Sequence, residues 1–441
     1  MSVGDLGRDV PGRYLKAPER PDASAEDVAD RVAGMLAEIR ANGITAVRGY
    51  AETLDGYAPD DFVVSLAERE AAVAGLDPEL RRQIDFALEQ VRAFAGHQLE
   101  CLTPLDVEMH PGIRLGHRLH PIASVGAYVP GGRYPLLASA FMTVAVAKVA
   151  GVPRVVAAAP PQGAAGIAPV QLAAMHLAGA DEIYAIGGVQ ALGAISYGVD
   201  GFGEAVDMLV GAGNAYVTEA KRQMFGTVGI DALAGPSELT IIADDAADPD
   251  LVATDLLGQA EHGPTSEVIL VTDSEAFGQA VLDAIPGLLA GLDTRAIAEV
   301  SWRDCGAIVV CDTPEDVVAA VDHIAPEHLE VQSADPDWYF ERLDAYGTVL
   351  LGASATVAYS DKAIGTNHVL PTGRAARYTG GLWVGSFIRV LTHQRVAAEA
   401  SGPVAEATIA IAEAEGLTGH ALSARVRLDS LREPATQGAK P

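Results

Sequence analysis

Cysteine is scarce in this chain. Only three cysteines occur among 441 residues, Cys101, Cys305 and Cys311, and their spacing matches no common metal or redox motif. This scarcity excludes a disulfide-rich secreted scaffold and a cysteine-ligated zinc site. The composition is typical of a protein from a reducing compartment, and we expect a cytoplasmic setting.

Long apolar runs and positive charge are also lacking. No run reaches the roughly 18–20 apolar residues that a membrane-spanning helix needs, and residues 1–24 contain no apolar stretch typical of a secretory leader. Against 30 Lys and Arg residues stand 59 Asp and Glu residues, so the net charge is −29. We therefore expect neither a membrane nor a nucleic-acid partner, because both need basic surfaces. A local site would have to attract any anionic ligand.

The apolar residues that are present follow a regular pattern. From residue 138 onward, short apolar runs alternate with helices rich in small residues, and the chain is long enough for two or three domains at roughly 150 residues each. The runs are "RVVAAAP", "EIYAIGG", "DMLVGAG", "LTIIADD", "SEVILVTDS", "GAIVVCD" and "TVLLGA". Such runs are typical of parallel strands that helices bury on both faces. The pattern predicts an α/β fold, with ligands beyond the carboxyl ends of the strands.

A complete dinucleotide-binding fingerprint is absent. "GAGNAY" (211–216) has the first two glycines of G-x-G-x-x-G, but Tyr216 stands where the third glycine belongs. By itself this stretch is either a weak cofactor signal or an ordinary tight turn. "AGPSELT" (234–240), which holds Ser237, could likewise contact a ligand or merely begin the next strand.

Two polar residues end an otherwise ordinary amphipathic helix. Asp248 can cap this helix and Pro249 suits its first turn, while "GP" at 263–264 ends it. Gln259 continues the apolar stripe of the helix and His262 lies one turn further, so both side chains are expected to face inward. The pair is either part of a metal site or a hydrogen-bonded helix end, and glutamine is not a usual zinc ligand.

Two further stretches concentrate acid–base residues. "IAPEHLEVQ" (324–332) places Glu327 beside His328, which suits general acid–base work or, alternatively, an exposed helix start with an acidic residue. "YSDKAIGTNHVLPTG" (359–373) holds Asp361 and His368 in what is either a site loop at a strand's carboxyl end or a surface turn. His420, taken alone, would be an exposed histidine of the tail.

These stretches, taken in order, resemble the histidinol dehydrogenase family. The segments that carry the resemblance are "VGAYVPGG", "AKVAGV", "GGVQALGA", "GAGNAYVTEAK", "GIDALAGPSEL", "DLLGQAEHG", "APEHLEVQ", "GTNHVLPTG" and "AEGLTGH". They run collinearly from about residue 25 to residue 427, nearly the whole chain. The resemblance implies a zinc- and NAD-dependent alcohol dehydrogenase with a small-molecule substrate.

The resemblance also implies roles for individual residues. The positions that match the zinc ligands are Gln259, His262, Asp361 and His420. The positions that match the catalytic acid–base pair are Glu327 and His328. The positions that match the NAD contacts are Tyr128, Gln190 and Asn214. The positions implied for the substrate site are Ser237, Gln259, His262, His328, Asp361, His368, Glu415 and His420. In such a site His328 would take the hydroxyl proton while NAD accepts the hydride, and Glu327 would activate water for a second oxidation.

The fold that the resemblance implies is a domain-swapped homodimer. Each chain would hold two α/β domains of incomplete Rossmann type with parallel sheets and small terminal helical arms. We expect an N-terminal arm at 1–25, a first domain made of 26–127 and 239–384, a second, NAD-binding domain at 128–238, and a helical tail at 385–441. Glu415 and His420 on this tail would then serve the partner chain.

Several departures from the family pattern bear on the substrate. Ala212 and Val146 stand where proline is usual, and "RAARYTGGLWVGSFIR" follows "HVLPTG". This texture is closer to the sulfopropanediol 3-dehydrogenase-like paralogues, and Arg374 and Arg377 could bind an anionic head group. We expect oxidation of a small, anionic primary alcohol through the aldehyde to the carboxylate. The alternatives are L-histidinol as the substrate and a catalytically silent, ligand-binding relative.

Overall fold

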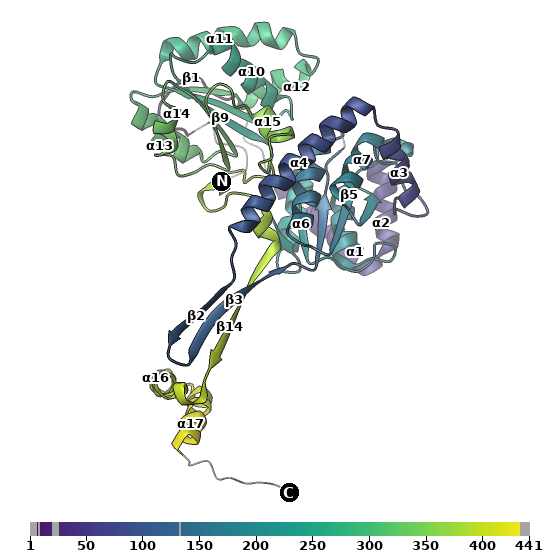
Figure 1. Cartoon of the computed structure of the whole chain (residues 1–441). Coiled ribbons are helices and arrows are strands. Elements are labelled where there is room, and N and C mark those ends of the chain that lie inside the picture. Colours follow the sequence, from purple (N-terminus) through teal and green to yellow (C-terminus); the bar gives the residue numbers. More distant parts are fainter. Residues whose placement is uncertain (1–6, 8, 20–25, 132–133, 433–441) are drawn as a thin grey trace. The chain divides into compact units, whose positions relative to one another are not determined.

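The structure, a computed structural model, describes residues 7, 9–19, 26–131 and 134–432. The chain divides into two compact units (Figure 1). Unit 1 comprises Met1–Leu99 and Ile122–Phe387, and unit 2 comprises Glu100–Pro121 and Ile388–Pro441. Among the described helices, none is both long and apolar enough to cross a membrane.

Unit 1 contains two separate sheets of mainly parallel strands. The five-stranded sheet has the order β6 (Glu182–Ala185), β5 (Arg154–Ala159), β4 (Ser124–Tyr128), β7 (Met208–Val210), β8 (Gly229–Ile230), and all its pairings are parallel. The six-stranded sheet has the order β1 (Arg13–Lys16), β11 (Ala307–Val310), β10 (Glu267–Thr272), β9 (Glu238–Ala243), β12 (His328–Gln332), β13 (Thr348–Leu351). Only β1 pairs antiparallel. The predicted α/β class and its buried parallel strands are confirmed.

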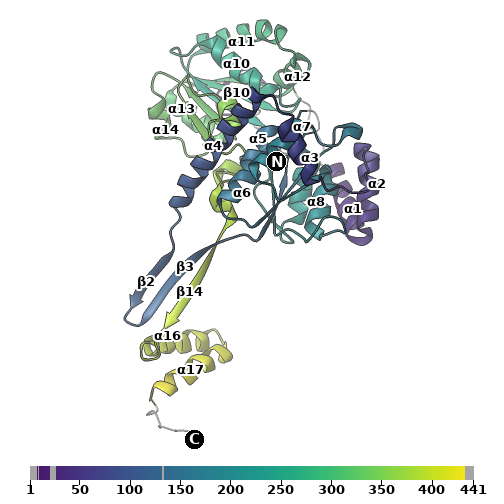
Figure 2. The ribbon, with the colours of Figure 1, turned by 45° about the vertical axis from the view of Figure 1, so that its right-hand side comes forward.

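Helices cover both faces of the six-stranded sheet (Figure 2). The helices, in chain order, are α10 (Pro249–Ala260), α11 (Glu275–Ala290), α12 (Arg295–Cys305), α13 (Pro314–Ile324), α14 (Pro336–Phe340) and α15 (Val357–Lys362). On one face, an apolar cluster joins β9 and β10 to helices α10, α11 and α12. On the other face, a second cluster joins the sheet to α13 and α14. This double cover explains why the strand sequences are continuously apolar.

The helices near the N-terminus belong with the five-stranded sheet. Helix α1 packs on α8 and α9, and α3 packs on α7. The stripe formed by Val32, Leu36 and Ile39 is buried against Leu192 and Ile195 of α8. The expected domain division instead groups residues 26–127 with 239–384, which hold most of the six-stranded sheet. The sequence could not show this packing, because an amphipathic stripe does not reveal which sheet it covers. The helices are α1 (Glu26–Asn42), α2 (Ile44–Tyr50), α3 (Leu66–Ala74), α4 (Pro78–Glu100), α5 (Leu137–Ala140), α6 (Val146–Val149), α7 (Pro169–Ala178), α8 (Gly188–Tyr197) and α9 (Ala215–Met224).

Helix α10 begins as its sequence predicts, but it ends at Ala260, before His262 and the Gly263–Pro264 pair that was expected to stop it. The Asp248 side chain accepts a hydrogen bond from the Asp250 N–H at 3.0 Å, and proline occupies the first turn. The side chain of Gln259 is completely buried on the apolar stripe. Just past the helix, the His262 N–H donates to the Gln259 carbonyl at 3.2 Å. The structure therefore confirms that the helix turns Gln259 inward.

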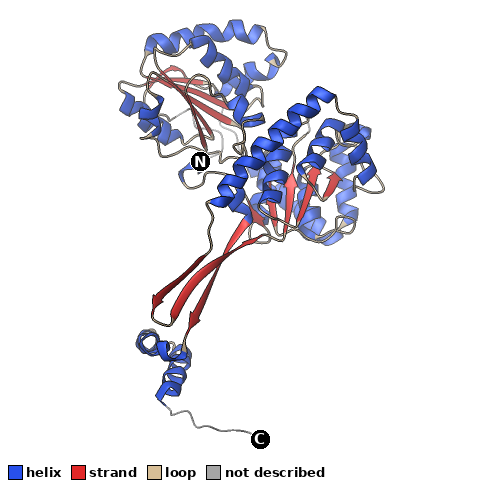
Figure 3. Cartoon of the chain, in the orientation of Figure 1, coloured by secondary structure: helices blue, strands red, loops and turns tan. Residues whose placement is uncertain are grey.

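Unit 2 is a three-stranded antiparallel sheet with two helices (Figure 3). Its strands are β2 (Leu105–His110), β3 (Ile113–Pro121) and β14 (Ile388–Val396), with β3 in the centre. Helices α16 (Ser401–Ala414) and α17 (Thr418–Arg432) pack on each other. They lie in the tail expected to be helical, but β14 precedes them and pairs with a segment far away in the sequence.

Parts of both expected arms fall outside the described residues. In the N-terminal arm these are residues 1–6, 8 and 20–25, and in the tail they are residues 433–441. The remaining short helical turns are η1 (Ala51–Asp55), η2 (Phe141–Ala145), η3 (Gly163–Ala165), η4 (Ala375–Arg377), η5 (Val384–Phe387) and η6 (Ala398–Ala400).

Candidate active site

Glu327 and His328 lie at the start of a buried strand. His328 is the first residue of β12, and the two residues are only 5% and 1% exposed. Glu327 Oε2 accepts hydrogen bonds from Ser237 Oγ at 2.9 Å and from the Glu238 N–H at 2.8 Å. His328 Nδ1 lies 3.1 Å from the Glu238 carbonyl, which can only accept, so Nδ1 carries the proton. The alternative of an exposed helix start is excluded.

Asp361 is the carboxylate on which the histidines of the site converge. Its Oδ1 lies 3.4 Å from His328 Nε2, and its Oδ2 lies 3.5 Å from His262 Nε2. His368 Nδ1 is 2.8 Å from the Asp361 carbonyl oxygen, and Lys362 Nζ is 3.7 Å from Oδ2. Asp361 lies at the end of helix α15, not in an open loop. The alternative of a surface turn is therefore excluded, and the segment contributes to a buried cluster.

Burial and charge act in opposite directions on these groups. Burial alone would lower the pKa of His328, but the carboxylates of Glu327 and Asp361 outweigh it and hold that pKa well above the usual value. Burial would raise the pKa of Asp361, yet His328 and the neighbouring cations hold it below the usual value. For His262 and His368 burial prevails and lowers the pKa. Their imidazoles are thus favoured in the neutral form, which has a free nitrogen lone pair.

The Gln259 amide is only half satisfied. Its Nε2 donates to Ser237 Oγ, whereas its Oε1 is buried without a hydrogen-bond partner. A buried carbonyl oxygen without a donor costs about 1–3 kcal/mol, and this oxygen is free to accept a bond from a ligand. Together with His262 and Asp361, it provides nitrogen and oxygen donors of the kind that zinc accepts. Within the described residues, however, no three His, Cys, Asp or Glu side chains gather closely enough to hold a metal.

Glu238 is a site residue that the sequence analysis missed. It is 3% exposed, and burial and the nearby Glu327 carboxylate raise its pKa well above the usual value. The Gly373 N–H donates to its Oε1 at 2.7 Å. The side chain therefore favours the neutral acid and ties the start of β9 to the loop after His368. The one local signal was its place next to Ser237.

A second buried acidic pair joins the elements of the site. Asp255 of α10 and Glu330 of β12 share a hydrogen bond, and Gln332 Nε2 donates to both, at 2.9 and 3.0 Å. Glu330 Oε1 accepts from the Val357 N–H at 2.6 Å, where α15 begins. The Thr356 hydroxyl donates to Asp255 at 3.0 Å. This network fixes α10, β12 and α15, which carry the donors described above.

The expected NAD contacts line one cavity of about 800 Å³ in unit 1. Tyr128 ends β4, while Gln190 and Asn214 lie at the starts of α8 and α9, which follow the carboxyl ends of β6 and β7, where such sheets collect ligands. The Tyr128 hydroxyl accepts from the Gly188 N–H at 3.2 Å, and Gln190 Nε2 donates to Asp55 at 2.9 Å. The Asn214 side chain caps α9. The structure therefore brings these three residues together.

A buried ion pair holds the loop before Asn214. Lys221 and Asp231 contact each other with side chains 2% and 0% exposed. Lys221 Nζ donates to the Gly211 carbonyl at 2.8 Å, and the Gly211 N–H donates to Asp231 at 2.7 Å. Gly211 has a φ of +113°, which other residues rarely adopt. The incomplete fingerprint is thus a turn whose backbone is fixed at Gly211 by hydrogen bonds to Lys221 and Asp231.

A smaller cavity of about 370 Å³ holds the catalytic candidates. Glu327, His328, Asp361 and His368 line it, and it shares Ser237 and His262 with the larger cavity. Glu327 and His328 lie at the amino end of β12, and Ser237 directly precedes β9. The larger cavity thus lies at the carboxyl ends of strands of the five-stranded sheet, whereas these residues of the smaller cavity lie at the amino ends of strands of the six-stranded sheet.

A sequence model described as Histidinol dehydrogenase matches residues 18–428. This chain belongs to that family. Histidinol dehydrogenases and their homologues are oxidoreductases, so the cavity is a dehydrogenase's candidate active site. The solved structure of histidinol dehydrogenase from Elizabethkingia anophelis superposes with a TM-score of 0.88 at 34% identity, covering 94% of this chain and 95% of that one.

Relatives in the histidinol dehydrogenase family carry two different substrate names. The sulfopropanediol 3-dehydrogenase of Ruegeria pomeroyi is 46% identical over 94% of this chain and 96% of its own length. The histidinol dehydrogenase of Cereibacter sphaeroides is 43% identical over 95% of both chains. The two identities are too close to choose between the substrates.

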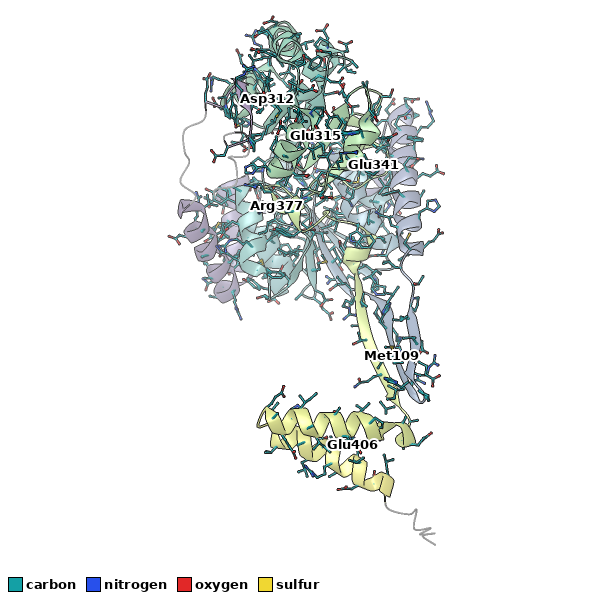
Figure 4. All side chains as sticks on the ribbon, turned by 90° about the vertical axis from the view of Figure 1, so that its left-hand side faces the viewer. Met109, Asp312, Glu315, Glu341, Arg377 and Glu406 are labelled. Carbon is teal, nitrogen blue, oxygen red and sulfur yellow. The ribbon has the colours of Figure 1, made fainter. Side chains whose placement is uncertain are left out.

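The remaining residues predicted for the site do not line these two cavities. Arg374 and Arg377 are not among the described residues that line either cavity. Arg377, which is labelled in Figure 4, donates from Nε to the Arg374 carbonyl at 3.0 Å. Burial lowers the pKa of His323, and both arginines lower it further. Glu415 and His420 are exposed residues at the end of α16 and on α17, in unit 2.

Proposed function

We propose that this chain is an NAD-linked, zinc-dependent dehydrogenase that oxidises a small, anionic primary alcohol. The observation that carries the proposal is the buried Nε2 of His328, which lies 3.4 Å from Asp361 Oδ1 and makes no hydrogen bond of good geometry. This buried nitrogen faces a cavity that also contains Asp361 and His262 and that adjoins a cavity large enough for a dinucleotide. A nitrogen in that position can exchange a proton with a bound hydroxyl group.

His328 and Glu327 supply the acid–base chemistry of the proposed reaction. The bond from Nδ1 to the Glu238 carbonyl fixes the ring, so that Nε2 receives the hydroxyl proton as hydride leaves for the cofactor. Proton uptake needs the neutral ring, and Asp361 is one of two carboxylates that hold it protonated. Engagement of Asp361 as a metal ligand weakens that hold. Glu327 would activate water for addition to the aldehyde, and a second NAD would accept the hydride that leaves as the carboxylate forms.

Zinc fits the donors that the site presents. Gln259 Oε1, the neutral His262 and the Asp361 carboxylate would hold it, and His420 of a second copy would complete the set. A bound zinc ion supplies a Lewis acid that polarises the alcohol oxygen. NAD, the hydride acceptor, would lie against Tyr128, Gln190 and Asn214.

The incomplete zinc set supports a homodimer that exchanges tails. Unit 2 exposes many large apolar side chains, as a surface made for a partner does. They are Leu105, Val107, Met109, Leu115, Val390, Leu391, Val396, Val404, Ile411, Leu417, Leu422, Val426 and Leu431. We propose that a second copy covers this surface and receives Glu415 and His420.

Anionic substrates are proposed because of the relative named sulfopropanediol 3-dehydrogenase and the sequence departures that this chain shows. The second candidate substrate is L-histidinol, which the relative named histidinol dehydrogenase favours. A histidinol molecule would bring an ammonium group and an imidazole into the cavity.

Steady-state assays distinguish the two substrates. The zinc-loaded protein and NAD are incubated with 2,3-dihydroxypropane-1-sulfonate or with L-histidinol, and NADH is followed by absorbance. We expect kcat/KM for the sulfonate to exceed that for histidinol by at least about tenfold, since each well-placed charged contact contributes about 1.4 kcal/mol or more. Efficient histidinol turnover would assign the second candidate. No NADH with any alcohol would indicate a silent, ligand-binding relative.

A further inference from the structure

Lys362 stands at the catalytic cavity without a role in the proposed chemistry. It is the last residue of α15 and lines both the catalytic cavity and a neighbouring cavity of about 350 Å³ that holds Gln259 and His262. Of the described residues around the catalytic cavity, it alone carries a permanent positive charge. Its side chain is 56% exposed, so the ammonium group lies where a ligand can reach it.

The position of Lys362 is set by the same contacts that place Asp361. Helix α15 begins at Val357, whose N–H is held by the buried Glu330, and Thr356 is held by Asp255. Lys362 Nζ is 3.7 Å from Asp361 Oδ2, a loose contact that leaves its three donors free for another anion. A short, fixed helix therefore presents one cation beside the reacting groups.

The surroundings of Lys362 make this cation selective. Ile84, Leu137 and Phe141 give the cavity an apolar wall that offers no second charged partner to an anion. The chain as a whole carries a charge of −29 and repels anions, so an anionic substrate needs a local cation. The positive charge of Lys362 also acts on neighbouring groups. Burial is the main cause of the lowered pKa of His262 and His368, and the charge of Lys362 lowers both further.

We infer that Lys362 is the residue that selects substrate charge by binding the sulfonate or carboxylate group of the alcohol. The inference rests on the proposed function and deepens it. A substrate ammonium group would be repelled from the same place. Lys362 takes over the part that the sequence analysis assigned to Arg374 and Arg377, which line neither cavity.

The test compares Lys362→Met and Lys362→Arg with the wild type. One arm measures kcat/KM for 2,3-dihydroxypropane-1-sulfonate and for neutral 1,2-propanediol. The other measures binding of the sulfonate to the zinc-loaded protein by calorimetry, which needs no turnover. Lys362→Met should raise both the KM and the Kd for the sulfonate by about tenfold or more. The kcat/KM for the neutral diol should change by less than about twofold. Lys362→Arg should stay within about threefold of wild type for both alcohols.

Lys148→Met is the matched control. Lys148 also pairs with an aspartate, Asp181, at 2.9 Å and is partly exposed, but it lines neither cavity. It should leave both alcohols unaffected. A sulfonate-to-diol selectivity that is unchanged in Lys362→Met overturns the inference, and so does a wild type that does not bind the sulfonate. If the wild type binds it but forms no NADH, the proposed function fails while the calorimetry still decides the role of Lys362.

Discussion

Gln259 is one of several buried glutamines among the described residues whose side-chain oxygen lacks a donor, and it is the one that lines a cavity together with His262 and Asp361. It is fully buried, and its carbonyl oxygen has no donor, although its amide nitrogen is hydrogen-bonded. Proteins rarely leave a buried polar atom unpaired, because each costs about 1–3 kcal/mol. A ligand at Oε1 removes that cost, so this glutamine becomes an argument for a metal at this position.

Gln259→Ala and His262→Ala should each lose bound zinc. Each removes one donor from an already incomplete set, so zinc affinity should fall by at least about a hundredfold, more than a change outside the ligands causes. Turnover should fall with it, and the far-ultraviolet circular dichroism should not change. Zinc content after dialysis is the measurement.

The matched control for this prediction is Gln279→Ala. Gln279 is an exposed glutamine on α11 that donates to Asp283 at 2.8 Å. Its zinc content should equal that of the wild type. Full zinc and activity in both Gln259→Ala and His262→Ala would remove these residues from the metal site.

Residue by residue, local pattern predicted only part of the site. The 3.6-residue period was sufficient to turn Gln259 inward, because helix geometry is local. Glu238, Asp255 and Lys362 carry no such signal. Their partners lie on other helices and strands. The contacts that assign these residues to the site therefore exist only after the chain has folded.

At the scale of elements, the Asp255–Glu330 pair connects a helix, a strand and a short helix. Burial first, and then the charge of Asp255, raise the pKa of Glu330 from 4.5 to about 8. The folded protein therefore keeps a proton that the unfolded chain releases above about pH 4.5. Stability from this group is complete below that value and is lost as the pH rises towards 8.

Glu330→Gln should flatten this part of the pH dependence. Glutamine stays neutral at every pH. The free energy of unfolding of the variant, relative to that of the wild type, should therefore increase as the pH rises from about 5 to about 8.5, by at most about 1.4 kcal/mol per pH unit. Urea unfolding of the zinc-free protein at several pH values measures the difference.

Glu341→Gln provides the comparison for this prediction. Glu341 has a side chain that is 74% exposed and is labelled in Figure 4. Its unfolding free energy should follow that of the wild type at every pH. A constant difference between Glu330→Gln and the wild type would show that Glu330 does not take up a proton on folding.

Most strands could be predicted because an apolar run reflects burial on both faces. Strand β12 was missed, since "HLEVQ" alternates with polar residues that turn out to be buried and paired, such as Glu330 and Gln332. The edge of the sheet that forms the site was missed as well. The two sheets contribute opposite strand ends to one cavity system, and nothing in a single strand's sequence records that.

At the scale of the whole molecule, two features support the proposed homodimer that exchanges tails. They are the incomplete set of zinc donors in unit 1 and the exposed apolar side chains of unit 2. Met109 of β2 and Glu406 of α16 mark this unit in Figure 4. Composition showed that such a chain can build large cores, but it could not show unit 2. That unit depends on β14 pairing with β3, and register between distant segments leaves no local trace.

Mixing two inactive variants tests whether the tail serves another chain. If the proposed tail exchange is right, co-expressed His262→Ala and His420→Ala chains should form heterodimers in which one site has its own His262 and the partner's intact His420. Random pairing should therefore restore about a quarter of wild-type activity, provided that each dimer has two equivalent sites. Each variant expressed alone should be inactive. No recovery in purified heterodimers would place His420 in its own chain's site or in none.

The central strand of unit 2 has a consequence for synthesis. Strand β3 pairs Ile113 with Val396, so one edge of it stays open until nearly the whole chain has left the ribosome. Contacts between such distant segments form late, and open strand edges invite aggregation while they wait. A chain terminated before residue 388 would keep that edge open permanently, even though unit 1 would be almost complete.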